Sequence, residues 1–295
     1  MSRQTKPPLG AQINYGHPLA NGLVDCWLLG ESSNAQTVNQ KTGKVSTSGS
    51  VPPARGSIDG MARVFNGATS SRSLDNTVQA LPDGTDYTVW ARCIPTVGGV
   101  LQSPLDSDDQ AGVRMFQLRF NASNQFEFVA FNTAISAFTA TSSTTMQLNR
   151  VASIAGSVRG TAVSVWANGL NAGSATLTGT LESSASIIMI GRRLTGAGPQ
   201  QFTGNILVAA RWNRALTERE HFLLHHDPYV LFRAQSPAMN ILSPIGGGGG
   251  GGYNSNMLLL GVRRLLTVYE LIRLREPMTR RQLGKVITSL VRWRP

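Results

Sequence analysis

The chain carries little charge and little cysteine, and it lacks long apolar runs. Only 15% of its 295 residues are charged, and its two cysteines, Cys26 and Cys93, are too few for a disulfide framework. Both stand in apolar, strand-like contexts that indicate small buried side chains. A single disulfide between the two is the alternative that the sequence leaves. No apolar run approaches the roughly 20 residues that span a bilayer, and the opening MSRQTKPPLGAQ lacks the apolar core of a secretory signal. We therefore expect a protein made in a cytoplasm without a signal peptide and without a membrane span.

Signatures of catalysis are also missing. No G-x-S-x-G stands between a strand and a helix, and the glycine run 246–252 lacks the Lys-Ser/Thr of a phosphate loop. Glu127 lies on a predicted strand, but it has no second carboxylate at i+2 or i+4 to form the facing pair that glycoside hydrolysis needs. The sequence therefore predicts no catalytic residues and no enzyme activity.

Metal binding has only weak candidates. His221 and His225 are four residues apart on a predicted helix, a spacing that binds zinc when a third ligand is present, but packing is the favoured role. Asp106, Asp108 and Asp109 form the one acidic cluster, which we interpret as a solvated turn and less readily as a contribution to a calcium site. We predict no metal and no cofactor, with calcium as the remaining alternative.

Short strands with alternating apolar residues are plentiful. Tyr87, Val89, Ala91 and Cys93 fall on one side of a strand, and residues 115–131 read as an antiparallel hairpin in which Phe116, Leu118 and Phe120 face away from Gln117 and Arg119. Further strands are predicted at 22–31, 62–66, 163–167, 187–190 and 206–210. Trp27, Trp90, Trp166 and Trp212 lie in such segments, so we expect burial for most of them and at most one on a binding surface.

One short helix is predicted near the end of this region. Thr217 and Glu220 have the spacing of a capping box, and Pro228 stops the helix after about two turns. Many strands, one helix and no βαβ rhythm predict an all-β, two-layer antiparallel sandwich of the jelly-roll type.

The composition divides the chain into four parts. Residues 1–20 read as an extended N-terminal arm, 21–232 as the sandwich, 233–252 as a Pro/Gly-rich linker that contains seven consecutive glycines, and 253–295 as a basic tail. The tail has nine Lys or Arg and two Glu, a net charge of +7 of the chain's +11. Its apolar residues recur at helical spacing with an interruption at Pro277, so we expect an amphipathic tail that is helical in part.

The tail is the predicted partner-binding segment. Basic side chains beside Leu, Val, Ile and Trp suit docking onto a protein assembly through an apolar face with an arginine rim. The residues that we assign to this contact are Arg263, Arg264, Tyr269, Arg273, Arg280, Arg281 and Trp293.

Six short motifs, in order over residues 22–228, resemble concanavalin A-like, laminin-G-like jelly rolls. They are GLVDCWLLGE, VFNG, YTVWARC, VSVWANG, MIGR and QFTGNILVAARWNRALTEREHFLLHHDP. The entry PPLGAQINYGHPLANGLVDCW and the exit DPYVLFR also resemble bacteriophage-encoded members, which are virion-associated. Two features depart from the family: residues 205–208 lack acidic residues that often accompany a calcium site, and the ExDxxE of related glucanases is absent.

The resemblance implies a protein that binds a ligand or forms part of a larger structure. The function that it favours is a bacteriophage virion structural protein, decorating the head or belonging to the tail or a fibre, which contacts other virion proteins and itself. The first alternative is a carbohydrate-binding adhesin for the host envelope, and the second, less favoured, is a nucleic-acid-associated protein that uses the basic tail. In the family, His221 and His225 fall at packing positions of the helix.

Overall fold

In the computed structural model, the described residues are 6–7, 11–30, 37–45, 53–57, 60–67, 76–77, 86–108, 114–182, 187–192 and 200–232. They belong to the first of two compact units, Met1–Gln235. The predicted linker 233–252 and tail 253–295, with its seven partner-binding residues, lie outside the described residues, so these predictions stay predictions.

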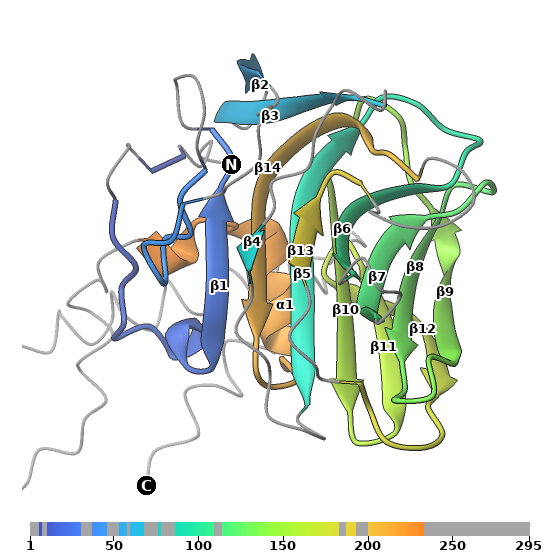
Figure 1. The fold of residues 1–295 in the computed structure, drawn as a ribbon. Coiled ribbons are helices and arrows are strands. Elements are labelled where there is room, and N and C mark those ends of the chain that lie inside the picture. Colours follow the sequence, from blue (N-terminus) through green and yellow to red (C-terminus); the bar gives the residue numbers. More distant parts are fainter. Residues whose placement is uncertain are drawn as a thin grey trace, which may run out of the picture. The chain divides into compact units, whose positions relative to one another are not determined.

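Two antiparallel sheets lie face to face, which confirms the predicted all-β sandwich (Figure 1). The eight-stranded sheet has the order β12-β11-β10-β5-β14-β3-β2, with β1 paired to β14. Its strands are β1 (Leu23–Leu28), β2 (Ala54–Ser57), β3 (Gly60–Asn66), β5 (Tyr87–Pro95), β10 (Ala152–Arg159), β11 (Ala162–Ala167), β12 (Leu170–Thr176) and β14 (Thr203–Trp212). The six-stranded sheet has the order β4-β13-β6-β7-β8-β9. It consists of β4 (Asn76–Thr77), β6 (Gln102–Asp108), β7 (Arg114–Phe120), β8 (Gln125–Phe131), β9 (Ala137–Thr145) and β13 (Ile187–Ile190).

The main core lies between the two sheets. The alternation in β5 is as predicted, since Tyr87, Val89, Ala91 and Cys93 all point into this core while Trp90 points to the other face. Aromatic rings from the six-stranded sheet fill the opposite side, and Tyr87 meets Phe128 edge-on with 6.1 Å between ring centroids. Burial of this apolar surface is the main force that holds the layers together.

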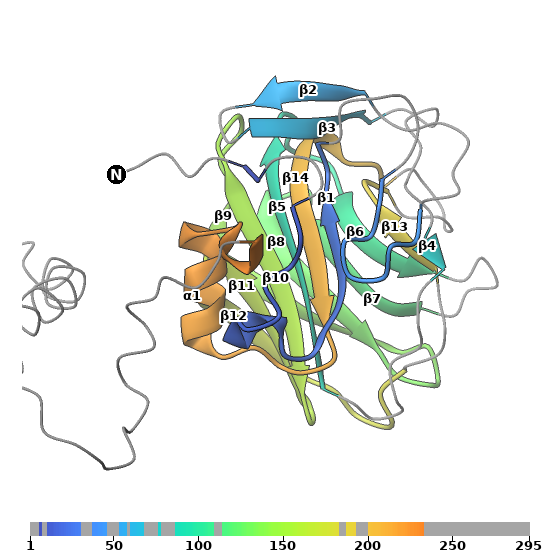
Figure 2. The same cartoon turned by 90° about the vertical axis from the view of Figure 1, so that its left-hand side faces the viewer.

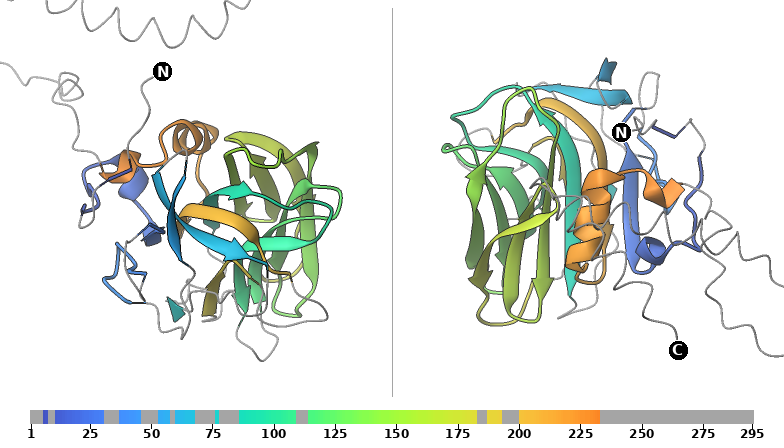
Figure 3. Two further views of the ribbon diagram at one scale, coloured as in Figure 1. Left: turned by 90° about the horizontal axis from the view of Figure 1, so that it is seen from above. Right: turned by 180° about the vertical axis from the view of Figure 1, so that it is seen from behind.

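A second apolar cluster covers the outer face of the eight-stranded sheet. There α1 (Glu218–His226), with the short 3₁₀ helices η1 (Pro18–Ala20) and η2 (Val230–Phe232), packs on side chains such as Trp90 and Trp212. Figure 2 shows α1 on the side of the sandwich away from β6 and β7, and Figure 3 shows it from behind. Because β14 contributes Ile206 to the main core and Leu207 to this cluster, it is covered on both faces.

Both ends of α1 are fixed by side chains. The predicted capping box is present: the Thr217 hydroxyl accepts from the backbone N–H of Glu220, whose carboxylate accepts from the N–H of Thr217. At the other end, Arg92 Nη1 on β5 donates to the carbonyl of His225 at 2.8 Å. A cation at a helix C-terminus complements the helix dipole, so α1 is held against the sheet at both ends.

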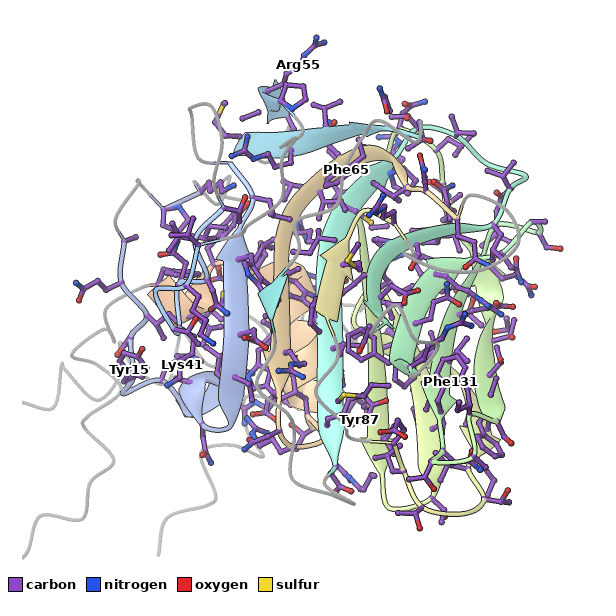
Figure 4. All side chains as sticks on the ribbon, in the orientation of Figure 1. Tyr15, Lys41, Arg55, Phe65, Tyr87 and Phe131 are labelled. Atoms are coloured by element: carbon purple, nitrogen blue, oxygen red, sulfur yellow. The ribbon has the colours of Figure 1, made fainter. Side chains whose placement is uncertain are left out.

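The prediction of an extended arm is wrong for residues 11–20. Leu19 is buried, its carbonyl accepts from Trp212 Nε1 at 2.7 Å, and the N–H of Asn14 donates to the carbonyl of Leu231 at 2.7 Å. The segment is mostly polar and contains Pro and Gly, which is why its sequence resembles an extended arm. Its few apolar residues nevertheless complete the second cluster. Tyr15 stays exposed, with Lys41 Nζ 4.5 Å from its ring centroid (Figure 4).

Close backbone approach closes one side of the sandwich. A side-chain carbon on Gly173 of β12 would lie 2.1 Å from the carbonyl oxygen of Thr141 on β9. Only glycine permits this contact. The free edges of β9 and β12 therefore shield one another.

Both cysteines are free thiols, which settles the question of pairing. Cys26 lies in the second cluster and Cys93 in the main core, on opposite faces of the eight-stranded sheet. Burial raises the pKa of Cys26 to about 12 and also raises the pKa of Cys93, so neither is a reactive thiolate at neutral pH.

Candidate ligand-binding face

Polar side chains gather on the outer face of the six-stranded sheet. Because Phe116, Leu118 and Phe120 point into the main core, Gln117 and Arg119 of β7 must point outward. The same alternation turns Glu127 of β8 outward, and register places Arg119 opposite Glu127 and Glu127 opposite Thr141 of β9. Three neighbouring strands thus present polar groups on one face.

Glu127 is the centre of this arrangement. Its Oε2 accepts from Arg119 Nε at 2.6 Å, and its Oε1 accepts from Asn121 Nδ2 at 2.8 Å and from Thr141 Oγ1 at 3.3 Å. The side chains of Arg119 and Glu127 are only 21% and 10% exposed. A charge-assisted pair at this depth is less screened than one at the open surface, so it holds both side chains in place.

Amide groups extend the network on both sides. Arg119 Nη1 donates to Gln117 Oε1 at 2.9 Å, and Gln117 Nε2 donates in turn to Gln200 Oε1. On the other side, Asn121 Nδ2 also donates to Gln125 Oε1, whose own amide donates to the carbonyl of Ser142. We refer to these side chains together as the outer-face network: Gln117, Arg119, Asn121, Gln125, Glu127, Thr141 and Gln200.

The network becomes more accessible from β6 towards β9. Gln117 and Gln200 are buried, Arg119, Asn121 and Gln125 are half-buried, and Thr141 is exposed. The exposed end combines guanidinium, amide and hydroxyl groups that already have fixed positions. Such groups offer donors and acceptors to the hydroxyl groups of a ligand at little cost in side-chain entropy.

The chemistry of the network does not suit catalysis or a metal. Glu127 is its single carboxylate and is engaged by three donors, whereas glycoside hydrolysis needs two facing carboxyl groups. Calcium needs six to eight oxygen ligands, whereas the amide and carboxylate oxygens of this network already accept hydrogen bonds from protein donors. Elsewhere among the described residues, no three His, Cys, Asp or Glu side chains form a group that could hold a metal ion.

The histidines of α1 have separate structural positions. His221 is buried with its ring stacked on Trp166, 4.0 Å between centroids and 13° between planes, so its predicted packing role is confirmed. Burial lowers the pKa of His221 to about 3. His225 Nδ1 forms a hydrogen bond with Ser153 Oγ at 2.9 Å, and His226 is exposed.

The prediction of a solvated acidic turn is wrong for Asp106. This residue is buried within β6, opposite Gln117 in register and opposite Met189 of β13. Ser-Pro-Leu-Asp-Ser-Asp has turn chemistry, but pairing with strands on both sides overrides it. Asp108 ends the strand, and Asp109 with the side chain of Asp108 lies outside the described residues.

Sequence reasoning found only part of the network. It placed Gln117, Arg119 and Glu127 on a hairpin and noted their alternation with phenylalanines, which is the signal for an outward polar face. It missed Asn121, Gln125, Thr141 and Gln200, because their positions depend on turn geometry and on pairing between distant segments. The four tryptophans within the sandwich are all buried, as expected for most of them, and none lies on this face.

A family model described as "Concanavalin A-like lectin/glucanases superfamily" matches residues 65–220, just over half of the chain. No curated protein matches in sequence. In the described region, no helix has the length and apolar character needed to cross a membrane.

Three solved structures share the fold at low identity. The binding domain of Paraclostridial Mosquitocidal Protein 1 has a TM-score of 0.55 and 14% identity, over 71% of this chain and 53% of that one. A Trypanosoma rangeli sialidase has a TM-score of 0.53 and 15% sequence identity, over 78% of this chain and 37% of that one. The binding domain of Botulinum neurotoxin serotype G has a TM-score of 0.53 and 10% sequence identity, over 70% of this chain and 51% of that one. The chain therefore spans about half or less of each of these structures.

Proposed function

The chain belongs to the concanavalin A-like lectin/glucanases superfamily, and from this premise we propose that its sandwich is a lectin-like module that binds glycan without chemical turnover. The observation that carries the proposal is the outer-face network. Its guanidinium, amide and hydroxyl groups are fixed by one another on an outward sheet face. Two of the similar solved structures are themselves described as binding domains, which agrees with this role.

Binding in place of hydrolysis follows from the state of Glu127. A general acid must have a proton to give, and a nucleophile must have a free lone pair facing the substrate. Glu127 instead accepts from Arg119, Asn121 and Thr141. We therefore expect glycans to leave the site unchanged.

Substitution of Arg119 tests the proposal. A glycan array identifies the strongest-bound sugar, and calorimetry then measures its affinity for the wild type, Arg119→Ala and the control Arg55→Ala. Arg55 is exposed on β2, away from the network (Figure 4). Arg119→Ala removes the guanidinium group that holds Glu127 and Gln117 in place, so it should weaken binding about tenfold or more, with less than about a twofold change in the control. Equal affinities in all three proteins, or no glycan bound by the wild type, would reject the proposal.

We further propose that the module is part of a bacteriophage virion, as a head decoration or a tail or fibre protein. The support is the resemblance of the segments that enter and leave the sandwich to phage-encoded members. In this proposal the tail, through Arg263, Arg264, Tyr269, Arg273, Arg280, Arg281 and Trp293, contacts other virion proteins and further copies of the chain.

Purified particles test the virion proposal. Mass spectrometry and immunogold labelling should find the protein on intact particles, and deletion of residues 253–295 should remove it from them. Absence of the full-length protein from particles would reject the proposal. If the tail instead binds unrelated DNA, with an affinity that falls steeply with salt, the nucleic-acid alternative replaces it.

A further inference from the structure

The outer-face network is electrically balanced. Of its seven side chains, Arg119 is the only cation and Glu127 the only anion, and they are joined at 2.6 Å. The five others, Gln117, Asn121, Gln125, Thr141 and Gln200, are uncharged. No positive charge in the network is left without a counterion.

A further carboxylate lies beside the network. Asp106 is opposite Gln117 in register, on the neighbouring strand of the same sheet. The Asp106 side chain is fully buried, so an acidic sugar arriving at this face would meet Glu127 and the one arginine of the network, which is already paired with it. Arginine binds a carboxylate well when its guanidinium fork is free, and here Nε and Nη1 are both donating to protein groups.

The exposed end of the network suits hydroxyl groups. The Gln125 amide and the Thr141 hydroxyl lie at this end, and such groups both donate and accept hydrogen bonds, as the hydroxyl groups of an uncharged sugar also do. Groups of this kind keep their affinity at high ionic strength, because screening acts on net charges.

We propose, on the basis of the glycan-binding function above, that the ligand is an uncharged glycan and that Glu127 excludes acidic sugars by neutralising Arg119. The specificity of the face then depends on one carboxylate. Glu127→Gln keeps the shape and the hydrogen-bonding oxygen, and it leaves Arg119 with an unbalanced charge. This variant should gain acidic ligands that the wild type rejects.

An array of matched pairs tests this inference, each pair a neutral oligosaccharide and the same oligosaccharide carrying one sialic or uronic acid. The wild type should bind the neutral member of a pair at least about tenfold more tightly, with less than a twofold change between 50 and 500 mM salt. Glu127→Gln should bind the acidic member at least about fivefold more tightly than the wild type does, and this gain should fall with salt.

The matched control is Glu218→Gln. Glu218 is exposed on α1, on the other side of the sandwich, so the substitution makes the same change of net charge away from the network. Its preference should equal that of the wild type. A parallel gain in both variants would mean that total charge, and not Glu127, sets the preference, and it would overturn the inference.

The wild type alone also decides the question, whatever the stability of the variants. Binding of the acidic member as tightly as the neutral one would overturn the inference and leave the glycan-binding function standing. No binding of either member by any of the proteins would overturn both.

Discussion

The two outer faces of the sandwich differ in what covers them. The face of the eight-stranded sheet is apolar and lies under α1, η1 and η2, where Trp90, Trp212 and Leu224 are buried together. The face of the six-stranded sheet carries the outer-face network, which ends in exposed hydroxyl and amide groups at β8 and β9. The covered face of the eight-stranded sheet contributes to stability, whereas the face of the six-stranded sheet presents polar groups to a ligand.

The difference shows how one fold separates two tasks. Helix α1 and the N-terminal segment remove a large apolar surface from water, which adds to the stability of the sandwich. Side chains on the opposite face are held by one another and need no helix above them. Changes on the covered face should therefore alter stability, whereas changes on the polar face should alter binding.

Removal of Trp212 should have the largest effect on stability. Its side chain is fully buried beneath the N-terminal segment. Truncation of a buried tryptophan to alanine costs about 3–5 kcal/mol, so Trp212→Ala should lower the free energy of unfolding in urea by that amount. Thr141→Ala, on the polar face, removes one hydrogen bond from an exposed hydroxyl and should change it by only about 1 kcal/mol. Similar losses in the two variants would break the comparison between the faces.

The covered face should also be the acid-sensitive one, through His221. Burial lowers the pKa of His221 to about 3, opposed by Glu220 and reinforced by Arg159 and Arg214. The unfolded chain therefore binds a proton at His221 near pH 6.5, whereas the native state does not bind it until about pH 3. The contribution of the neutral ring to stability is fully present above pH 6.5 and is lost as the pH falls towards 3.

His221→Phe keeps a ring on Trp166 and removes the titration. Between pH 7 and pH 4.5 the wild type should lose about 2–3 kcal/mol more than this variant in urea unfolding. His226→Phe, at an exposed histidine of the same helix, is the control and should follow the wild type. Parallel profiles for wild type and His221→Phe would show that the ring is not a buried neutral histidine.

The smallest expected effect lies at the tip of the β8–β9 hairpin. Ile135 is 49% exposed and has a φ of 61°, a conformation that is strained for a β-branched residue. The Asn132 side chain holds the turn by accepting from the N–H groups of Ala134 and Ser136. Ile135→Asn should raise the free energy of unfolding by about 1 kcal/mol and the Tm by about 2–4 °C. Val100→Asn, at an exposed apolar residue without a positive φ, should give no such gain.

Local patterns predicted the fold because its elements obey local rules. Tyr87 to Cys93 alternate, Thr217 and Glu220 cap a helix, and Phe126 and Phe128 flank Glu127, so strands, helix and hairpin were each visible in a few residues. Residues 11–20 and Asp106 were misjudged because their surroundings come from distant segments. The same limit applies to the network: Gln200 meets Gln117 across 83 positions of the chain, a contact that no local spacing reveals.

Hydrogen–deuterium exchange with and without the best-bound neutral glycan tests the binding face most directly. We predict slower exchange in residues 114–145, which form β7, β8 and β9, and unchanged exchange in α1 and β10–β12. Protection confined to α1 or to residues 152–176 would place the ligand on the other face and contradict this account.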